Sequence, residues 1–240
     1  MATSRFTDNG DVRIHYLDSG GDDRGAPVIF VPGMTCIAED YAEILPLFGR
    51  RAVVIDLRGH GRSGAPATGY DAATLSADVG AVVDTVTDGP VHVVTFSRGT
   101  TYAIMWAIEN FERVRSVAIG DYVPEEKALT PEMSRRLLDG RWRGTPVSER
   151  LDEDAANKTF QAAQERSLWD PLARQHLPLL AVRSGERFLV GDAQWSRYQT
   201  LFPHAHLVEF LDSPHDIFRP DRGRYPRLVC EHVDRADETR

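Results

Sequence analysis

Ser97 is the residue whose type and setting point most directly to covalent chemistry. It lies in the run Thr-Phe-Ser-Arg-Gly at 95–99, between a strand-like run over 91–94 and a helix-like run over 99–110. A serine on such a strand-to-helix turn holds its hydroxyl above the sheet, and the helix N-terminus beneath it stabilises developing negative charge. The usual sequence of a turn that carries a nucleophilic serine is Gly-x-Ser-x-Gly. Its first glycine, two residues before the serine, is Thr95 in this chain. The spacing therefore predicts a serine nucleophile on a variant turn, and the alternative for this motif alone is an ordinary strand-to-helix turn.

Two backbone N–H groups are candidates for stabilising the oxyanion that such a nucleophile creates. Gly33 comes two residues after a buried apolar run over 27–31 and lets the backbone turn sharply. That turn can aim the N–H of Met34 toward the space above Ser97, where the N–H of Arg98 also points. Two such donors form an oxyanion hole, and the alternative is an ordinary Pro-Gly turn.

His215 is the expected general base. It follows the last strand-like run, over 207–210, by a few residues, so a parallel sheet places it at the same edge as Ser97. An imidazole there is suited to taking and returning a proton near neutral pH. The pair His204 and His206 is typical of metal ligands, but no third ligand has a fitting spacing, so no metal site is predicted.

Alternating strands and helices must position these side chains. Strand-like runs cover 12–16, 27–31, 51–55, 91–94, 114–119, 179–182 and 207–210, and helix-like runs cover 38–45, 71–86 and 99–110. This alternation predicts an α/β fold with a mostly parallel, doubly wound sheet of about eight strands. Between the runs over 114–119 and 179–182, which are the sixth and seventh strands of such an eight-stranded sheet, the chain is polar and helical. We expect a core of 1–120 and 178–240 and a short helical lid of 121–177 inserted after strand 6.

The lid is expected to cover the edge of the sheet where open α/β sheets bind ligands. Thr130 should open one of its helices and 148–168 should form another. Trp142 and Phe188, with Gly33, are expected to line an apolar substrate pocket there, although packing inside the lid and core explains such aromatic residues equally well. The polar residues 234–240 are expected to fray.

Composition bounds the class of protein and its partners. The 240 residues are 42% hydrophobic and 27% charged, as in ordinary globular proteins. The formal net charge of −8 argues against nucleic acid or an anionic membrane as partner, so a small-molecule substrate is expected. No apolar run is long enough to span a bilayer, and the first residues lack the apolar stretch of a signal peptide. With two cysteines, these features favour a cytoplasmic location, and the oligomeric state is left open.

A glycine-rich loop at 56–64 contains the spacing of a dinucleotide fingerprint, Gly-x-Gly-x-x-Gly. The glycines are followed by Ala-Pro-Ala-Thr-Gly and not by a helix whose N-terminus would hold a pyrophosphate. No cofactor is therefore expected. Asp56 and Arg58 are expected to fix this loop, by pairing or by hydrogen bonds.

The order of these motifs resembles that of α/β-hydrolase fold proteins over nearly the whole chain. It runs from the Gly33 loop through Asp-x-Arg-Gly-His-Gly-x-Ser at 56–63 to the Ser97 turn, a lid and His215. The resemblance implies that Ser97 is the nucleophile and His215 the general base. It also implies that the two N–H groups described above form the oxyanion hole.

The carboxylate of the site is where the chain departs from the family pattern. Family members usually place an aspartate shortly after the seventh strand, where this chain has Phe188. Asp121 lies after the sixth strand, where some members place their acid, and it is the favoured candidate. Asp192 is the alternative acid, although it is equally well explained as a helix cap. Glu186, or no acid at all, also stays open.

Serine chemistry of this kind predicts a hydrolase of a small-molecule ester, lactone, thioester or activated C–C bond. A serine at 97 argues against haloalkane dehalogenase or epoxide hydrolase chemistry, for which this fold uses an aspartate. The Arg98 side chain suggests an anionic substrate unless it points to solvent. Two alternatives stay open: a cofactor-free oxygenase of the same fold, and a ligand-binding member without turnover, which Thr95 and Phe188 motivate.

Overall fold

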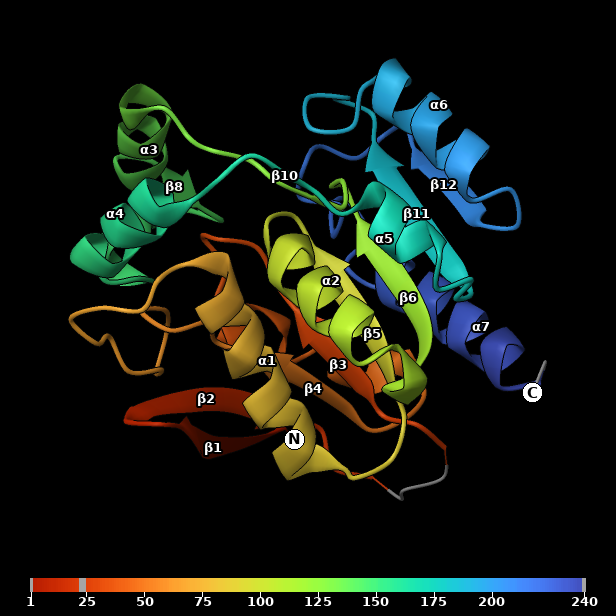
Figure 1. The fold of residues 1–240 in the computed structure, drawn as a ribbon, viewed down its shortest axis with the longest axis horizontal. Coiled ribbons are helices and arrows are strands. Elements are labelled where there is room, and N and C mark those ends of the chain that lie inside the picture. Colours follow the sequence, from red (N-terminus) through yellow and green to blue (C-terminus); the bar gives the residue numbers. More distant parts are fainter. Residues whose placement is uncertain (1, 22–24, 239–240) are drawn as a thin grey trace.

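One eight-stranded sheet organises the computed structural model, which describes residues 2–21 and 25–238. Its strands are β1 (Thr3–Asn9), β2 (Val12–Asp18), β3 (Val28–Val31), β4 (Ala52–Ile55), β5 (Val91–Phe96), β6 (Val114–Gly120), β11 (Leu179–Ser184) and β12 (His206–Phe210). They lie in the order β1-β2-β4-β3-β5-β6-β11-β12 (Figure 1). The β1–β2 and β2–β4 pairs are antiparallel and the other pairs are parallel. The predicted sheet is therefore confirmed.

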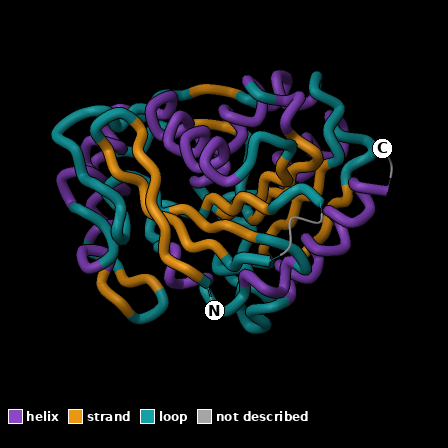
Figure 2. The backbone as a smooth tube through the Cα atoms, turned by 90° about the horizontal axis from the view of Figure 1, so that it is seen from below, coloured by secondary structure: helices purple, strands orange, loops and turns teal. Residues whose placement is uncertain are grey.

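Helices cover both faces of this sheet, and Figure 2 shows the strands running between them. The first face carries α1 (Ala72–Val86), α2 (Gly99–Glu109), α5 (Trp169–Ala173) and α6 (Asp192–Leu201). The second face carries α7 (Arg224–Glu238) and the short 3-10 helices η1 (Ala38–Tyr41) and η2 (Leu45–Phe48). This arrangement confirms the doubly wound α/β class.

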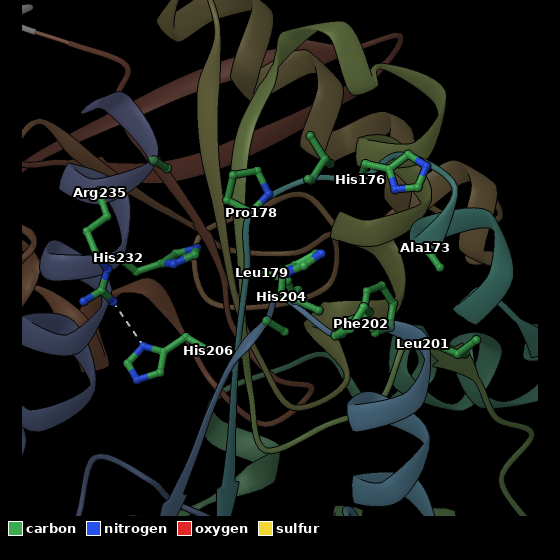
Figure 3. A pocket seen from close by; sticks show the side chains of 14 residues that line it. Ala173, His176, Pro178, Leu179, Leu201, Phe202, His204, His206, His232 and Arg235 are labelled. Carbon is green, nitrogen blue, oxygen red and sulfur yellow. Dashed lines mark hydrogen bonds between the residues drawn. The ribbon is translucent and has the colours of Figure 1, made fainter. Parts of the chain in front are cut away.

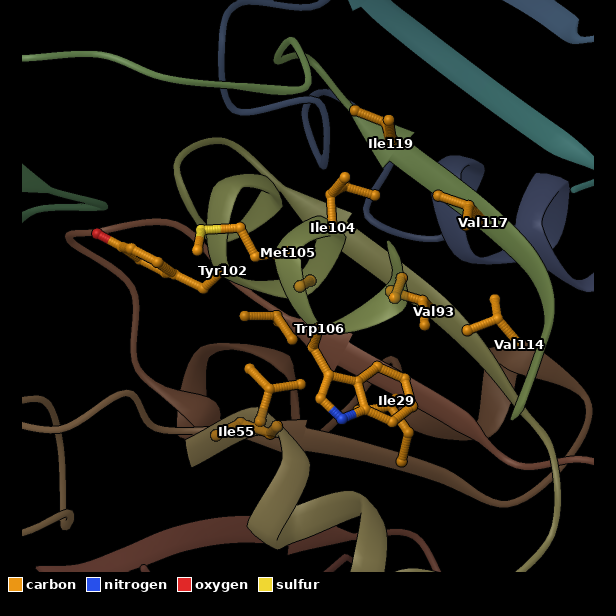
Figure 4. Packing of buried hydrophobic residues seen from close by; sticks show 14 of the residues in the cluster. Ile29, Ile55, Val93, Tyr102, Ile104, Met105, Trp106, Val114, Val117 and Ile119 are labelled. Carbon is orange, nitrogen blue, oxygen red and sulfur yellow. The ribbon is translucent and has the colours of Figure 1, made fainter. Parts of the chain in front are cut away.

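The larger apolar core lies between the sheet and the helices of the first face. Trp106 of α2 packs among branched residues of the strands, such as Ile29, Val93 and Val117 (Figure 4). All six residues of β5 are buried, because a central parallel strand is covered on both of its faces. The core thus holds rigid the strand that ends immediately before Ser97.

The segment 121–177, between β6 and β11, contains short elements that lie mostly away from the sheet (Figure 1). These are β7 (Glu125–Glu126), α3 (Pro131–Leu138), β8 (Arg141–Trp142), β9 (Thr145–Pro146), η4 (Val147–Glu149), α4 (Glu153–Ala162) and β10 (Arg166–Ser167), followed by α5. A small apolar cluster that includes Val147 and Phe160 packs against Met34. Trp169 of α5, in contrast, is buried in the main core, so part of the predicted lid range joins the core.

Within this segment, one helix prediction is confirmed and one is wrong. Thr130 caps α3, and its hydroxyl accepts the Met133 N–H at 3.2 Å. The predicted helix over 148–168 is helical only in η4 and α4. Its end instead pairs with β7 as the strand β10, so tertiary pairing overrides the local helical preference.

Two further sequence expectations need correction. The predicted helix over 38–45 is two short 3-10 helices, and Pro46 lies in the first turn of the second, where its missing N–H leaves no bond unmade. The expected frayed tail over 234–240 is helical as far as Glu238, because Val233 and Ala236 are buried against the sheet.

Met1 and 239–240, the ends of the predicted core ranges, lie outside the described residues. Within the described ranges, no helix is long and apolar enough to cross a bilayer.

Candidate active site

The turn that carries Ser97 is tightly packed and has a left-handed backbone. Ser97 has a φ of 52°, and its N–H donates to the carbonyl oxygen of Gly120 at 2.9 Å. A Cβ on Gly33 would lie 2.8 Å from the Ser97 Cβ, and one on Gly99 would overlap the Pro32 carbonyl. Glycine is therefore required at both positions for the loop after β3 to approach the serine.

Thr95 replaces the usual glycine of this turn without a buried polar penalty. Its side chain is fully buried, and its hydroxyl donates to the carbonyl oxygen of Ala118 at 3.3 Å. The hydroxyl oxygen of Thr100 lies 2.8 Å from the hydroxyl oxygen of Thr95. Because both hydroxyls have partners, this turn accommodates a threonine.

Ser97, His215 and Asp121 form a continuous chain of hydrogen bonds. The Ser97 hydroxyl lies 3.0 Å from His215 Nε2, and His215 Nδ1 donates to Asp121 Oδ2 at 2.7 Å. Asp121 is 1% exposed and has a φ of 43°, and its Oδ1 accepts the Ser184 N–H at 2.7 Å. The structure thus brings together a hydroxyl, an imidazole and a carboxylate in the arrangement of a nucleophile, a base and an orienting acid.

The other two acid candidates contact different groups. Glu186 Oε2 accepts the backbone N–H of His215 at 3.0 Å, so it holds the loop and not the imidazole. Asp192 is the first residue of α6, and its carboxylate accepts from Arg183 at 2.9 Å. The Phe96 ring stacks on the His215 imidazole, with centroids 5.0 Å apart, and fixes its plane. Of the three carboxylates, Asp121 is the one bonded to the imidazole.

The expected oxyanion donors, Met34 and Arg98, flank Ser97, and His60 fixes the first of them. In the described part of the chain, neither backbone N–H is bonded to another residue. His60 Nε2 lies 2.5 Å from the Met34 carbonyl oxygen. The other ring nitrogen, Nδ1, lies 3.0 Å from the Arg58 carbonyl oxygen, and burial lowers the pKa of His60. Sequence reasoning missed this role because the partners are 26 residues apart.

The loop at 56–64 is fixed as expected, but Asp56 and Arg58 do not pair with each other. Asp56 accepts from His15 Nδ1 and from the N–H of Ala38, both at 2.6 Å. The Arg58 guanidinium donates to both carboxylate oxygens of Asp78, at 2.6 and 2.5 Å. Asp78 belongs to α1, so the sequence of the loop alone could not predict it as the partner of Arg58.

The Arg98 side chain neither points to solvent nor lines the cavity above Ser97. It is 5% exposed, its Nε donates to the Tyr102 hydroxyl at 3.2 Å, and its Nη1 donates to the carbonyl oxygen of Lys127 at 2.9 Å. Arg98 therefore ties α2 to the start of segment 121–177. Its side chain gives no support to an anionic substrate.

A cavity of about 280 Å³ opens above Ser97 and His215. It is lined by Gly33, Met34, Thr35, Cys36, Phe96, Ser97, Arg136, Leu137, Gly140, Arg141, Trp142, Val147 and His215. Gly33 and Trp142, which the sequence analysis places at a substrate pocket, line this cavity. Phe188 does not: it is 75% exposed and lies outside the cavity. The loop after β11 thus turns this ring toward solvent.

A second cavity, of about 740 Å³, lies where β11 and β12 begin, at the edge of the sheet opposite Ser97. His176, His204, His206 and His232 line it (Figure 3). His206 receives a hydrogen bond from Arg235 at 3.1 Å. Among the described residues, no three histidine, cysteine or acidic side chains converge closely enough to hold a metal ion.

Comparisons with known proteins agree with this fold. A family model described as "alpha/beta hydrolase fold" matches residues 26–146. A non-heme chloroperoxidase of Streptomyces lividans is 38% identical over 91 residues, 36% of this chain and 33% of that protein. A soluble epoxide hydrolase of a Corynebacterium strain is 30% identical over 114 residues, 47% of this chain and 39% of that protein. The chain therefore spans less than half the length of these curated relatives.

A solved structure extends the likeness to nearly the whole chain. The enol-lactonase from Burkholderia xenovorans superposes with a TM-score of 0.79 and covers 96% of this chain and 100% of its own. Its sequence identity is 18%, so the likeness concerns the fold.

Proposed function

The chain belongs to the α/β-hydrolase fold family, and from this premise we propose that it hydrolyses a small-molecule ester, lactone or thioester. The observation that carries the proposal is the bonded series from Ser97 Oγ through the His215 imidazole to Asp121. Ser97 is the nucleophile, His215 the general base and Asp121 the orienting acid. The enol-lactonase likeness supports this class, because a lactone is a cyclic ester.

The reaction begins when Ser97 Oγ bonds to the substrate carbonyl carbon and its proton passes to His215 Nε2. The carbonyl oxygen becomes an oxyanion that accepts from the N–H groups of Met34 and Arg98. When the tetrahedral intermediate collapses, the bond to the leaving alcohol or thiol breaks, and that group takes the proton from His215. The acyl group stays on Ser97.

The second half of the cycle returns the enzyme to its starting state. Water gives a proton to His215 and bonds to the acyl carbon, and the Oγ–carbon bond then breaks as Ser97 regains its proton. The Asp121 carboxylate keeps the Nδ1–H of His215 in place and stabilises the transient imidazolium. A serine at this turn does not supply the carboxylate nucleophile that epoxide hydrolysis would need.

Segment 121–177 acts in this proposal as a lid that forms the roof of the cavity. Its residues Leu137, Trp142 and Val147 supply apolar walls opposite Ser97. Such walls exclude water around the reacting carbonyl and select substrates by shape.

Labelling with a fluorophosphonate tests the nucleophile directly. The wild-type protein should gain one adduct, mapped to Ser97 by peptide mass, and His215→Ala should gain none over the same time. Hydrolysis of a panel of short 4-nitrophenyl esters would then measure turnover. Absence of labelling, together with oxygen uptake on aromatic substrates that survives Ser97→Ala, would replace the proposal by the oxygenase alternative.

A further inference from the structure

Two arginines of segment 121–177 line the cavity that contains Ser97. Arg136 comes from α3 and Arg141 from β8, and among the described residues no acidic side chain lines the same cavity. The chain as a whole has a formal net charge of −8. The charged side chains that line this cavity are therefore opposite in sign to the protein's average, and Glu132, outside the lining, offsets part of the charge of Arg136.

Arg136 and Arg141 are both exposed, so an anion can reach their guanidinium groups. Arg141 donates through Nε and Nη2 to the carbonyl oxygen of Gly144, at 3.0 and 2.5 Å, which holds the side chain in place within the β8–β9 hairpin. Arg136 pairs with Glu132 at 2.9 Å on the exposed surface of α3. An exposed pair of this kind contributes little stability, so a ligand carboxylate can compete for the guanidinium. Guanidinium groups bind carboxylates through paired hydrogen bonds.

We propose that the substrate is an ester or thioester whose acyl part carries a carboxylate, bound by Arg136 and Arg141. This inference rests on the proposed function. The proposal places the charge on the acyl part, which stays in the cavity, attached to Ser97, after the leaving group has departed. The cavity volume of about 280 Å³ and the apolar walls at Leu137 and Trp142 suit a short chain between the carbonyl and the carboxylate.

Two esters with the same leaving group test the proposal. 4-Nitrophenyl butyrate and 4-nitrophenyl hemisuccinate differ in whether the acyl chain ends in a methyl group or a carboxylate. We expect the wild-type enzyme to have the higher kcat/KM for the hemisuccinate, after subtraction of enzyme-free hydrolysis. Arg136→Gln and Arg141→Gln should each lower the hemisuccinate-to-butyrate ratio of kcat/KM by about tenfold. Salt at about 0.5 M should lower the same ratio for the wild-type enzyme, because it screens the charges.

Arg135→Gln is the matched control. Arg135 is adjacent to Arg136 on α3, but it is exposed and lines a different surface pocket. The control should keep the wild-type ratio. A wild-type preference for butyrate, or equal ratios in the Arg136, Arg141 and Arg135 variants, would overturn the proposed substrate class while leaving the esterase chemistry intact.

Binding without turnover separates the two proposals. Calorimetric titration of the Ser97→Ala protein with monomethyl succinate and with methyl butyrate should show tighter binding of the anion. The Arg136→Gln and Arg141→Gln changes together should abolish this difference. If neither ester is hydrolysed by the wild type, the proposed function fails, and the titration still decides whether the arginines form a carboxylate site. Equal binding of both compounds would reject that site.

Discussion

The guanidinium of Arg143 and the carboxylate of Asp216 face each other through two hydrogen bonds, each 2.8 Å long. Both side chains are about nine-tenths buried, at 10% and 9% exposed. Arg143 lies in the β8–β9 turn with a φ of 50°, and Asp216 directly follows His215. Arg150 makes a similar two-bonded pair with Asp40. These pairs fasten segment 121–177 to the loops that surround the reacting groups.

Asp216→Asn should therefore weaken both the fold and the site. Removal of one partner leaves the Arg143 charge buried without a counter-ion, and we expect the free energy of unfolding to fall by about 3 kcal/mol. Fluorophosphonate labelling of Ser97 should slow, because the loop that holds His215 loses its anchor. Arg219→Gln is the control, since this exposed arginine also faces Asp216, at 3.4 Å. Equal urea unfolding curves for the two variants would refute the expectation.

Asp121→Asn should abolish most of the activity, whereas Asp192→Asn should have little effect on it. An amide in place of the Asp121 carboxylate favours the wrong imidazole tautomer, and a loss of about 10³- to 10⁴-fold in kcat is expected. Asp192→Asn should stay within about twofold of the wild type, because its exposed carboxylate pairs with Arg183 and not with the imidazole. Ester hydrolysis rates of both variants decide between the two acids, and the reverse order of effects would reassign the role to Asp192.

Thr95→Gly should restore the usual pattern of the turn and yet destabilise the protein. The change leaves the buried hydroxyl of Thr100 without its partner and adds backbone freedom, which together cost about 1–2 kcal/mol. Ser97 labelling should be retained, because glycine suits the turn. Thr95→Ser keeps the hydroxyl and is the control in thermal unfolding. A glycine variant as stable as the serine variant would contradict the structural role given to this hydroxyl.

Acid should destabilise the fold through His232. Burial, and then the nearby charge of Arg235, lower the pKa of His232 to about 4. The unfolded chain takes up a proton at this histidine below about pH 6.5, whereas the folded chain does so only near pH 4, so the free energy of unfolding falls as the pH drops through this window. His232 alone should account for about 3 kcal/mol of that loss.

Urea unfolding at a series of pH values from about 4.5 to about 7.5 measures how the free energy of unfolding depends on pH. His232→Gln should flatten the slope of unfolding free energy against pH, even if it lowers stability at every pH. His204→Gln changes an exposed histidine of the same cavity and should leave the slope as it is. An unchanged slope in His232→Gln would show that the buried imidazole is not the group responsible.

Residues that end buried strands could be predicted from the sequence, and residues fixed by distant partners could not. Ser97, Asp121 and His215 each follow an apolar run, so the parallel sheet determines which edge they share. The bonds of Arg143 to Asp216 and of His60 to Met34 link loops by side-chain geometry, which has no periodic signature. The position of Phe188 could not be predicted either, because the path of a loop decides whether an aromatic ring enters a cavity.

Asp121 and Ser97 lie at the ends of neighbouring strands and are 24 residues apart in the chain, and the first is bonded to a histidine 94 positions further on. During translation, the nucleophile and the acid therefore leave the ribosome long before the base does. A nascent chain that already carries the hydroxyl and the carboxylate has no imidazole to activate either of them. In the proposed mechanism, ester hydrolysis consequently begins only when the loop after β12 has been made and has docked.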